Sequence, residues 1–409
     1  MTLNATEQHK TMAMSRGMIL LFAVATGQAV ASNYLAQPLL DTIRGDLGIS
    51  VEVAGLIMTV AQVGYAAGLI LLLPLGDLLE RRRLITVLAL ITAAGMAVAA
   101  VTPSIAPFML AVGVIGLTSV MAQILVPFAA TLAPEAERGR VVGTVMSGLI
   151  VGILLARVFS GMVAELAGWR TVYWLAAVLM LVQAGVLYRA LPRYHEPVRL
   201  SYARLLASVP RLALELPVLR RRAVFGLLSF ASFSVLWTTL AFLLAGPAYG
   251  YGEGAIGLFG LVGAAGALTA TVVGRFNDRG WGRAVTGSSA VLLVAGFLLL
   301  WLGQTSLVAL LAGIVVLDVG SNGVHITNQS YIYRVRPEAR SRINAFYMTS
   351  CFVGAALGSA AAAFVYSQAG WHGVCVLGSG IGVASVAWWA LELAGRTGTD
   401  SEKQGRTAP

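Results

Sequence analysis

Long uncharged stretches alternate with short charged ones along almost the whole chain. The uncharged stretches are about 18–25 residues long, which is the length that an α-helix needs to cross the hydrocarbon core of a bilayer. The pattern therefore predicts twelve membrane-spanning helices. Their approximate ranges are 18–40, 53–75, 84–101, 108–132, 141–166, 171–188, 223–248, 255–273, 284–302, 306–333, 343–365 and 374–393.

The composition agrees with a membrane protein. Hydrophobic residues make up 58% of the 409 residues and charged residues only 11%, whereas soluble domains are about 25% charged. The first stretch is too long for the apolar region of a cleaved signal peptide, and eleven more follow it, so we expect it to stay as a helix. The predicted fold class is an all-α integral membrane protein.

The net charge of +10 could indicate a nucleic-acid partner, but the positions of the basic residues argue against one. All of the 28 Lys and Arg residues except Arg44, Arg157 and Arg170 fall in the two tails or in every second loop. Those segments share one membrane face if twelve helices alternate in direction. Because basic loops stay in the cytoplasm, both termini are predicted to be cytoplasmic.

One long polar and basic interval, 189–222, divides the predicted helices into six and six. We expect it to be a cytoplasmic linker, with a short amphipathic helix on the membrane surface. Segments 18–188 and 223–393 then form two six-helix bundles, and segments 1–17 and 394–409 are cytoplasmic tails.

The two halves repeat each other. Residues 73–82 and 274–283 each carry an Asp followed by arginines where an apolar stretch ends, 201 residues apart. Gly152 is matched by Gly354 at a similar offset. A tandem duplication of this kind is typical of transporters built from parallel repeats. The charged residues form either a cytoplasmic gate or clusters that only fix topology: Asp77, Arg81, Arg82, Asp278, Arg279 and Arg283.

The fifth predicted helix combines small residues with one buried cation. Small side chains let helix backbones approach closely, and here they are Gly143, Gly152, Ala156, Ser160 and Gly161. Arg157 lies deep in the same helix, where a guanidinium needs a cavity or a partner. It is a candidate for proton coupling or for binding a charged substrate, and the alternative is a tie between two helices.

The tenth predicted helix carries a polar stripe. Asp318, Asn322, His325 and Gln329 lie on one helix face. Such a stripe must line water or protein, and both Asp318 and His325 can exchange protons. Alternatively, Asp318 only neutralises Arg157 and His325 only packs. Further neutral groups that could line a substrate cavity are Gln28, Asn33, Tyr34, Gln37, Gln123 and Trp237.

The charged repeat resembles the loop motif Gly-x-x-x-Asp-Arg-x-Gly-Arg-Arg of the major facilitator superfamily. The first copy matches at Asp77, Arg81 and Arg82 but departs at Leu73, and the second copy keeps the Gly and the first Arg. The fifth-helix spacing is similar to the antiporter branch of drug–proton and sugar-efflux exporters. Arg157 stands where that branch has Pro, and the family's usual Arg of the fourth helix is absent.

This resemblance implies a secondary transporter with two six-helix bundles, alternating access, a cavity lined by helices 1, 4, 7 and 10, and no cofactor. Its most concrete form is a monomeric, proton-coupled exporter of a small organic molecule in a bacterial inner membrane. The alternatives are import of a sugar or organic anion, with Arg157 binding the anion, and a membrane sensor that transports nothing.

Other classes find little support in the sequence. An enzyme is the least expected, because the chain has no phosphate-binding glycine loop and no paired catalytic residues. Cys351 and Cys375 lie in two different apolar stretches, which fits packing residues and not a metal site or a disulfide.

Overall fold

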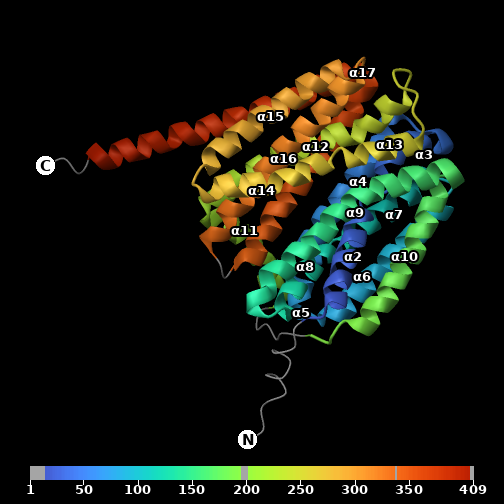
Figure 1. The fold of residues 1–409 in the computed structure, drawn as a ribbon, viewed down its shortest axis with the longest axis horizontal. Coiled ribbons are helices and arrows are strands. Elements are labelled where there is room, and N and C mark those ends of the chain that lie inside the picture. The colour runs from blue at the N-terminus through green and yellow to red at the C-terminus, as the bar shows by residue number, and fades with distance from the viewer. Residues whose placement is uncertain (1–13, 195–200, 337–338, 406–409) are drawn as a thin grey trace, which may run out of the picture. The chain divides into compact units, whose positions relative to one another are not determined.

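The computed structural model describes residues 14–194, 201–336 and 339–405 (Figure 1). All regular elements in this part of the chain are helices. Nine of the described helices are long and apolar enough to cross a membrane. The predicted all-α fold class is confirmed, and the order of elements is consistent with twelve passes.

The first six passes run from α2 to α10. The elements are α2 (Arg16–Ala31), η1 (Gln37–Leu39), α3 (Leu40–Leu47), α4 (Val51–Leu71), α5 (Leu75–Leu78), α6 (Arg81–Val101), α7 (Ile105–Ser119), α8 (Met121–Leu132), η2 (Glu135–Glu137), α9 (Arg138–Ala167) and α10 (Trp169–Ala190). Within the interval that the sequence predicts to be a linker, α11 spans Tyr202–Glu215.

The last six passes follow the linker. They are α12 (Pro217–Ala245), α13 (Glu253–Leu258), η3 (Phe259–Leu261), α14 (Ala264–Asp278), α15 (Gly282–Leu302), α16 (Leu307–Val335) and α17 (Arg340–Gly405). Two predicted passes are joined in α17, which bends at Gly370, where φ is 62°. Glycine alone adopts this backbone without a steric penalty.

Several predicted continuous helices are interrupted, including the fourth, which is divided into α7 and α8 at Val120. The first helix ends at Ala31, and the chain re-enters a short helical turn at Gln37. Pro38 explains the break, because its ring lacks an N–H and excludes the carbonyl of residue 34 from a regular turn. The eighth pass is divided into α13, η3 and α14, with Gly260 and Gly263 at the division.

The chain forms two compact units. One contains Met1–Arg211 and Leu244–Leu261, and the other contains Leu212–Leu243 and Val262–Pro409. Segment 244–261 thus belongs to the same compact unit as the first half of the chain. The duplication seen in the sequence does not predict this grouping. The bundle boundaries predicted from the linker remain a prediction.

Glycines bring the first and fifth passes into backbone contact, and the packing is duplicated. In the first unit Gly148 and Gly152 of α9 lie against the backbone of Ala23 and Gly27 of α2. In the second unit Gly354 and Gly358 of α17 lie in the same way against Leu227 and Ala231 of α12. The repeat seen in the sequence is therefore also a repeat of helix packing.

Replacing Gly152 by Ala should destabilise the first unit, because the new Cβ would collide with the backbone of Gly27. Overpacking of this kind costs about 1–3 kcal/mol, which should lower the melting temperature of the purified protein by several degrees. Gly143→Ala is the matched control, since a Cβ there meets no heavy atom within 4 Å. Equal melting temperatures for both variants would contradict the packing.

Candidate functional site

Arg157 lies at the centre of a buried cluster in the first unit. Its side chain is only 3% exposed. The Nε atom donates a hydrogen bond to Gln37 Oε1 at 2.6 Å, and the guanidinium lies 5.4 Å from the centre of the Tyr34 ring. The break after Ala31 is what brings Tyr34 and Gln37 to this depth. One turn further along α9, the Ser160 hydroxyl donates to the carbonyl of Leu35 at 2.5 Å.

Helix α13 and η3 close over the same stretch of α9. A Cβ at Gly257 would lie 2.5 Å from the carbonyl oxygen of Arg157, and one at Gly260 would lie 2.7 Å from the Arg157 Cβ. Gly161 packs against the backbone of Glu253 and lies close to the Gly257 Cα. The guanidinium and its aliphatic stem are therefore enclosed by three chain segments, and only glycine fits at these positions.

Polar contacts continue from this cluster toward the loops of the predicted outer face. The Thr42 hydroxyl donates to Glu253 Oε1 at 2.7 Å. Arg170 pairs with Asp46, which also accepts a hydrogen bond from the Trp169 indole at 3.2 Å. Sequence reasoning missed Thr42 of α3 and Glu253 of α13, because neither belongs to a recognisable motif and they are 211 residues apart.

Asp318 is the centre of a second buried cluster, in the second unit. It is 2% exposed, and the Trp237 indole donates to its Oδ1 at 3.3 Å. The Asn322 amide donates to the Asp318 carbonyl at 2.9 Å. Gly266 of α14 packs on both, since a Cβ there would lie 3.0 Å from the Asp318 Cβ. Helices α12, α14 and α16 thus meet around this carboxyl group.

His325 lies on the same helix as Asp318 but contacts different residues. Its Nδ1 is 3.0 Å from the Tyr347 hydroxyl, and its ring lies 5.4 Å from that of Phe230. Asn328 donates to the same hydroxyl at 3.3 Å. The predicted stripe therefore has two parts, with Gln329 partly exposed beyond them. Tyr347 was missed because it reads as one more aromatic residue in an apolar helix.

The remaining predicted cavity residues contact different partners. The Asn33 amide donates to Gln62 Oε1 at 3.5 Å, and the Gln123 amide donates to the Tyr65 hydroxyl at 3.3 Å. Gln28 instead lines a pocket with Ser32. Helix α4 thus supplies partners, Gln62 and Tyr65, that the sequence pattern did not single out.

The first charged motif forms a compact network in its own unit. Arg81 Nη2 lies 3.8 Å from Asp77 Oδ1, while Arg81 Nε donates to the Gly76 carbonyl at 3.1 Å. The guanidinium also lies 5.2 Å from the ring centre of Tyr194. Arg82 pairs with Glu80 at 3.4 Å.

The second charged motif makes an ion pair with a neighbouring helix. Asp278 lies 3.6 Å from Arg334 of α16. Both side chains are more than two-thirds exposed, at 78% and 71%, so the pair contributes at most about 1 kcal/mol. Arg283 meets the end of α17 through its backbone, where its carbonyl accepts the Trp389 indole at 3.0 Å.

Arg222 was counted with the basic linker but is a buried residue. It is 1% exposed and donates to both carboxylate oxygens of Glu392, at 3.0 and 3.1 Å. Its guanidinium also lies 4.2 Å from the centre of the Tyr331 ring. The pair ties α12 to the C-terminal part of α17, a role that the charge pattern alone could not reveal.

Metal binding has no support in the described residues, where no group of three or more His, Cys, Asp or Glu side chains could hold an ion. Cys351 and Cys375 are buried free thiols.

Apolar helices that enclose buried polar clusters are typical of a multi-pass membrane transporter. Comparisons with known proteins agree with this class of protein. The family model of the Major Facilitator Superfamily matches residues 21–335 and 226–409. The chain belongs to the major facilitator superfamily. It is accordingly a transporter and not an enzyme.

Individual relatives and structures are consistent with the family. The transporter YgaY of Escherichia coli O157:H7 is 52% identical over 92% of this chain and 96% of its own length. A chloramphenicol resistance protein of Streptomyces lividans is 28% identical over 68% of this chain and 70% of its own. The crystal structure of the nucleoside transporter NupG has a TM-score of 0.74 at 15% identity, covering 91% of this chain and 98% of that one.

Proposed function

We propose that this protein exports a small organic molecule by alternating access, in exchange for protons. The observation that carries the proposal is Asp318, a carboxyl group 2% exposed inside a transmembrane helix and hydrogen-bonded by Trp237. A carboxylate is expensive at membrane depth, so intramembrane acids commonly mark proton or substrate paths. A carboxyl group at this position can lose and regain a proton.

The direction of transport rests on two supports. The small-residue spacing of α9 resembles that of the antiporter branch, and Gly152 and Gly161 of that spacing meet neighbouring backbones. One relative of this chain is a chloramphenicol resistance protein. We place the protein in a bacterial inner membrane as a monomer with both termini in the cytoplasm, as the basic loops predict.

The gate and cavity residues complete the proposal. The networks around Asp77 and Arg81, and the pair of Asp278 with Arg334, would hold the cytoplasmic ends of the helices when the cavity opens outward. In the second unit, the substrate would contact Trp237 and Asn322, which both lie beside Asp318.

The test begins with a thermal-shift screen of the purified protein against drugs and metabolites, with chloramphenicol first. The compound that gives the largest shift is then added outside proteoliposomes whose interior is more acidic than the medium. We expect uptake into vesicles that mimic export, driven by the proton gradient and abolished by a protonophore. Transport that is indifferent to the gradient would refute proton coupling, and proton-driven movement in the opposite direction would favour the importer.

A further inference from the structure

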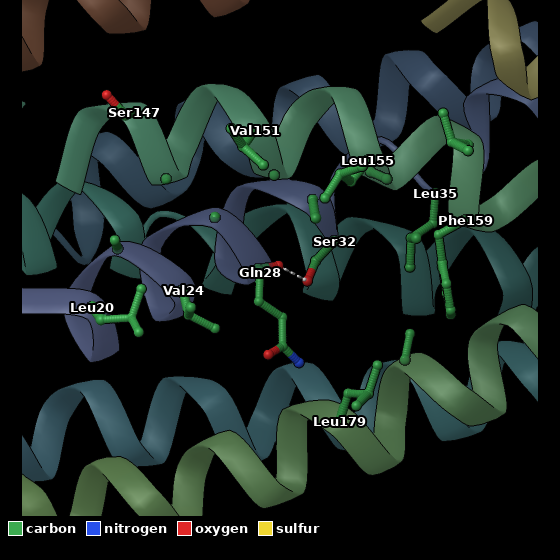
Figure 2. Close-up of a pocket in the computed structure, with 18 of the residues that line it drawn as sticks. Leu20, Val24, Gln28, Ser32, Leu35, Ser147, Val151, Leu155, Phe159 and Leu179 are labelled. Atoms are coloured by element: carbon green, nitrogen blue, oxygen red, sulfur yellow. Dashed lines mark hydrogen bonds between the residues drawn. The ribbon is translucent and has the colours of Figure 1, made fainter. Parts of the chain in front are cut away.

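A large apolar pocket lies within the first unit, between α2, α6, α9 and α10 (Figure 2). Its volume is about 710 Å³, within the range of about 300–1,000 Å³ that is usual for small-molecule sites. Several lining side chains are also exposed at the protein surface, including Leu20 at 62%, Val151 at 50% and Leu179 at 50%. These residues belong to helices of the predicted first, fifth and sixth passes, so the exposed side of the pocket lies at membrane depth.

Small residues create the space. The backbones of α2 and α9 touch where Gly27 meets Gly152 and where Ala23 meets Gly148. Those four residues line the pocket, together with Ala176 of α10. Their side chains are too short to fill the volume between α9 and α10. The close packing that joins the first and fifth passes therefore leaves a hollow beside it.

One polar group is directed into this hollow. Figure 2 shows the Gln28 side chain extending away from α2, toward Leu179. Among the described residues none hydrogen-bonds its carboxamide, whereas its backbone carbonyl accepts the Ser32 hydroxyl at 2.9 Å. The other hydroxyls of the lining are turned back to their own helix, as Thr144 is to the Arg140 carbonyl at 3.0 Å. A primary amide at this depth, about 18 Å along α2 from Arg16, lacks the partner that water would supply.

We propose that this pocket binds an uncharged, mostly apolar small molecule that enters from the bilayer and pairs one hydrogen-bonding group with Gln28. A phospholipid chain would fill the space but would leave the amide unpaired, since its ester groups stay at the interface. A cation is disfavoured because no acidic residue lines the pocket. The pocket residues belong to the first unit and Asp318 to the second, and the proposal does not depend on the proposed export of a substrate.

The test uses N-phenyl-1-naphthylamine, an apolar fluorophore with a single N–H that brightens in apolar surroundings. The full-length protein in phosphatidylcholine nanodiscs is titrated, and the signal of empty nanodiscs is subtracted. We expect saturable binding by the wild type. Gln28→Leu should weaken it about tenfold, which equals about 1.4 kcal/mol and is the size of one hydrogen bond.

Filling the pocket should abolish binding. Val151→Trp places a bulky ring in the lining from α9, and Leu179→Trp does so from α10, so that one variant remains if the other fails to fold. Val182→Trp is the matched control, because Val182 is 59% exposed on α10 and lies outside the lining. It should bind the probe as the wild type does.

Three results would overturn the proposal. They are a signal that does not saturate, undiminished binding by both pocket-filling variants, and unchanged affinity in Gln28→Leu. A phosphatidylcholine molecule that co-purifies with the wild type, is absent from Val151→Trp and resists displacement by the probe would assign the pocket to lipid instead. Because no proton gradient is applied, a failure here is distinguishable from a failure of proton coupling.

Discussion

Asp318→Asn is expected to uncouple transport from the pH gradient. Asparagine keeps the shape of the side chain and can still accept the Trp237 indole hydrogen bond, which is 3.3 Å long in the structure. It cannot exchange a proton, so it mimics a permanently protonated carboxyl group. Gradient-driven flux should fall at least about tenfold, a barrier change of about 1.4 kcal/mol, while exchange of labelled for unlabelled substrate without a gradient should persist.

A surface carboxylate provides the control for that experiment. Asp41 is paired with Arg44 at 2.8 Å, with both side chains about one-third exposed. Asp41→Asn should therefore transport as the wild type does. If Asp318→Asn kept full gradient-driven flux, Asp318 would be a packing residue only. If the variant lost exchange as well, the defect would lie in substrate binding or in the conformational cycle and not in coupling alone.

Arg157→Met should cause the second large effect. Methionine preserves much of the aliphatic stem that packs on Gly260 but removes the bond to Gln37 and the charge near Tyr34. A hydrogen bond to a charged group is worth about 1.5–3 kcal/mol. Since the guanidinium is enclosed by α9, η1 and η3, we expect Arg157 to act as a positioning residue. The maximal rate should fall about tenfold or more, with the apparent KM changed less than about threefold.

A double-mutant cycle with Gln37 gives the sharper test. Gln37→Leu removes the acceptor at 2.6 Å from Arg157 Nε, so it should slow transport similarly. Because the two changes remove one shared interaction, the double variant should be little worse than either single variant. A large rise in KM at an unchanged maximal rate would mean instead that Arg157 binds an anionic substrate, and the anion importer would become the better interpretation.

Helix positions were largely predictable from the sequence, because a bilayer demands apolar helices of a set length. The breaks within these helices were harder to predict from the sequence. Pro38 was visible, yet the unwinding that it causes places Tyr34 and Gln37 beside Arg157, a contact across 120 residues. The small residues of α9 were predicted from their spacing alone, which does not distinguish Gly152, whose Cα packs on the backbone of Gly27, from Gly143, which has open space beside it.

Partners of the polar residues were mostly beyond the sequence. Helical spacing placed Asp318 and His325 on one face of α16. However, different neighbouring helices pack against that face at the two positions. Trp237 therefore meets Asp318, and Tyr347 meets His325. Likewise, Arg222 read as one of several linker arginines, and only its burial against Glu392 distinguishes it.

By itself, the sequence determined that this is a multi-pass membrane protein of duplicated construction, and its motifs indicated the transporter family. Local properties suffice for this, because helix length, charge distribution and repeat spacing are written along the chain. Only the tertiary structure decided which polar groups face each other, that segment 244–261 groups with the first half, and that Gln28 faces an apolar pocket. Periodicity specifies the face of a helix, but the neighbour on that face is set by contacts between segments far apart in the chain.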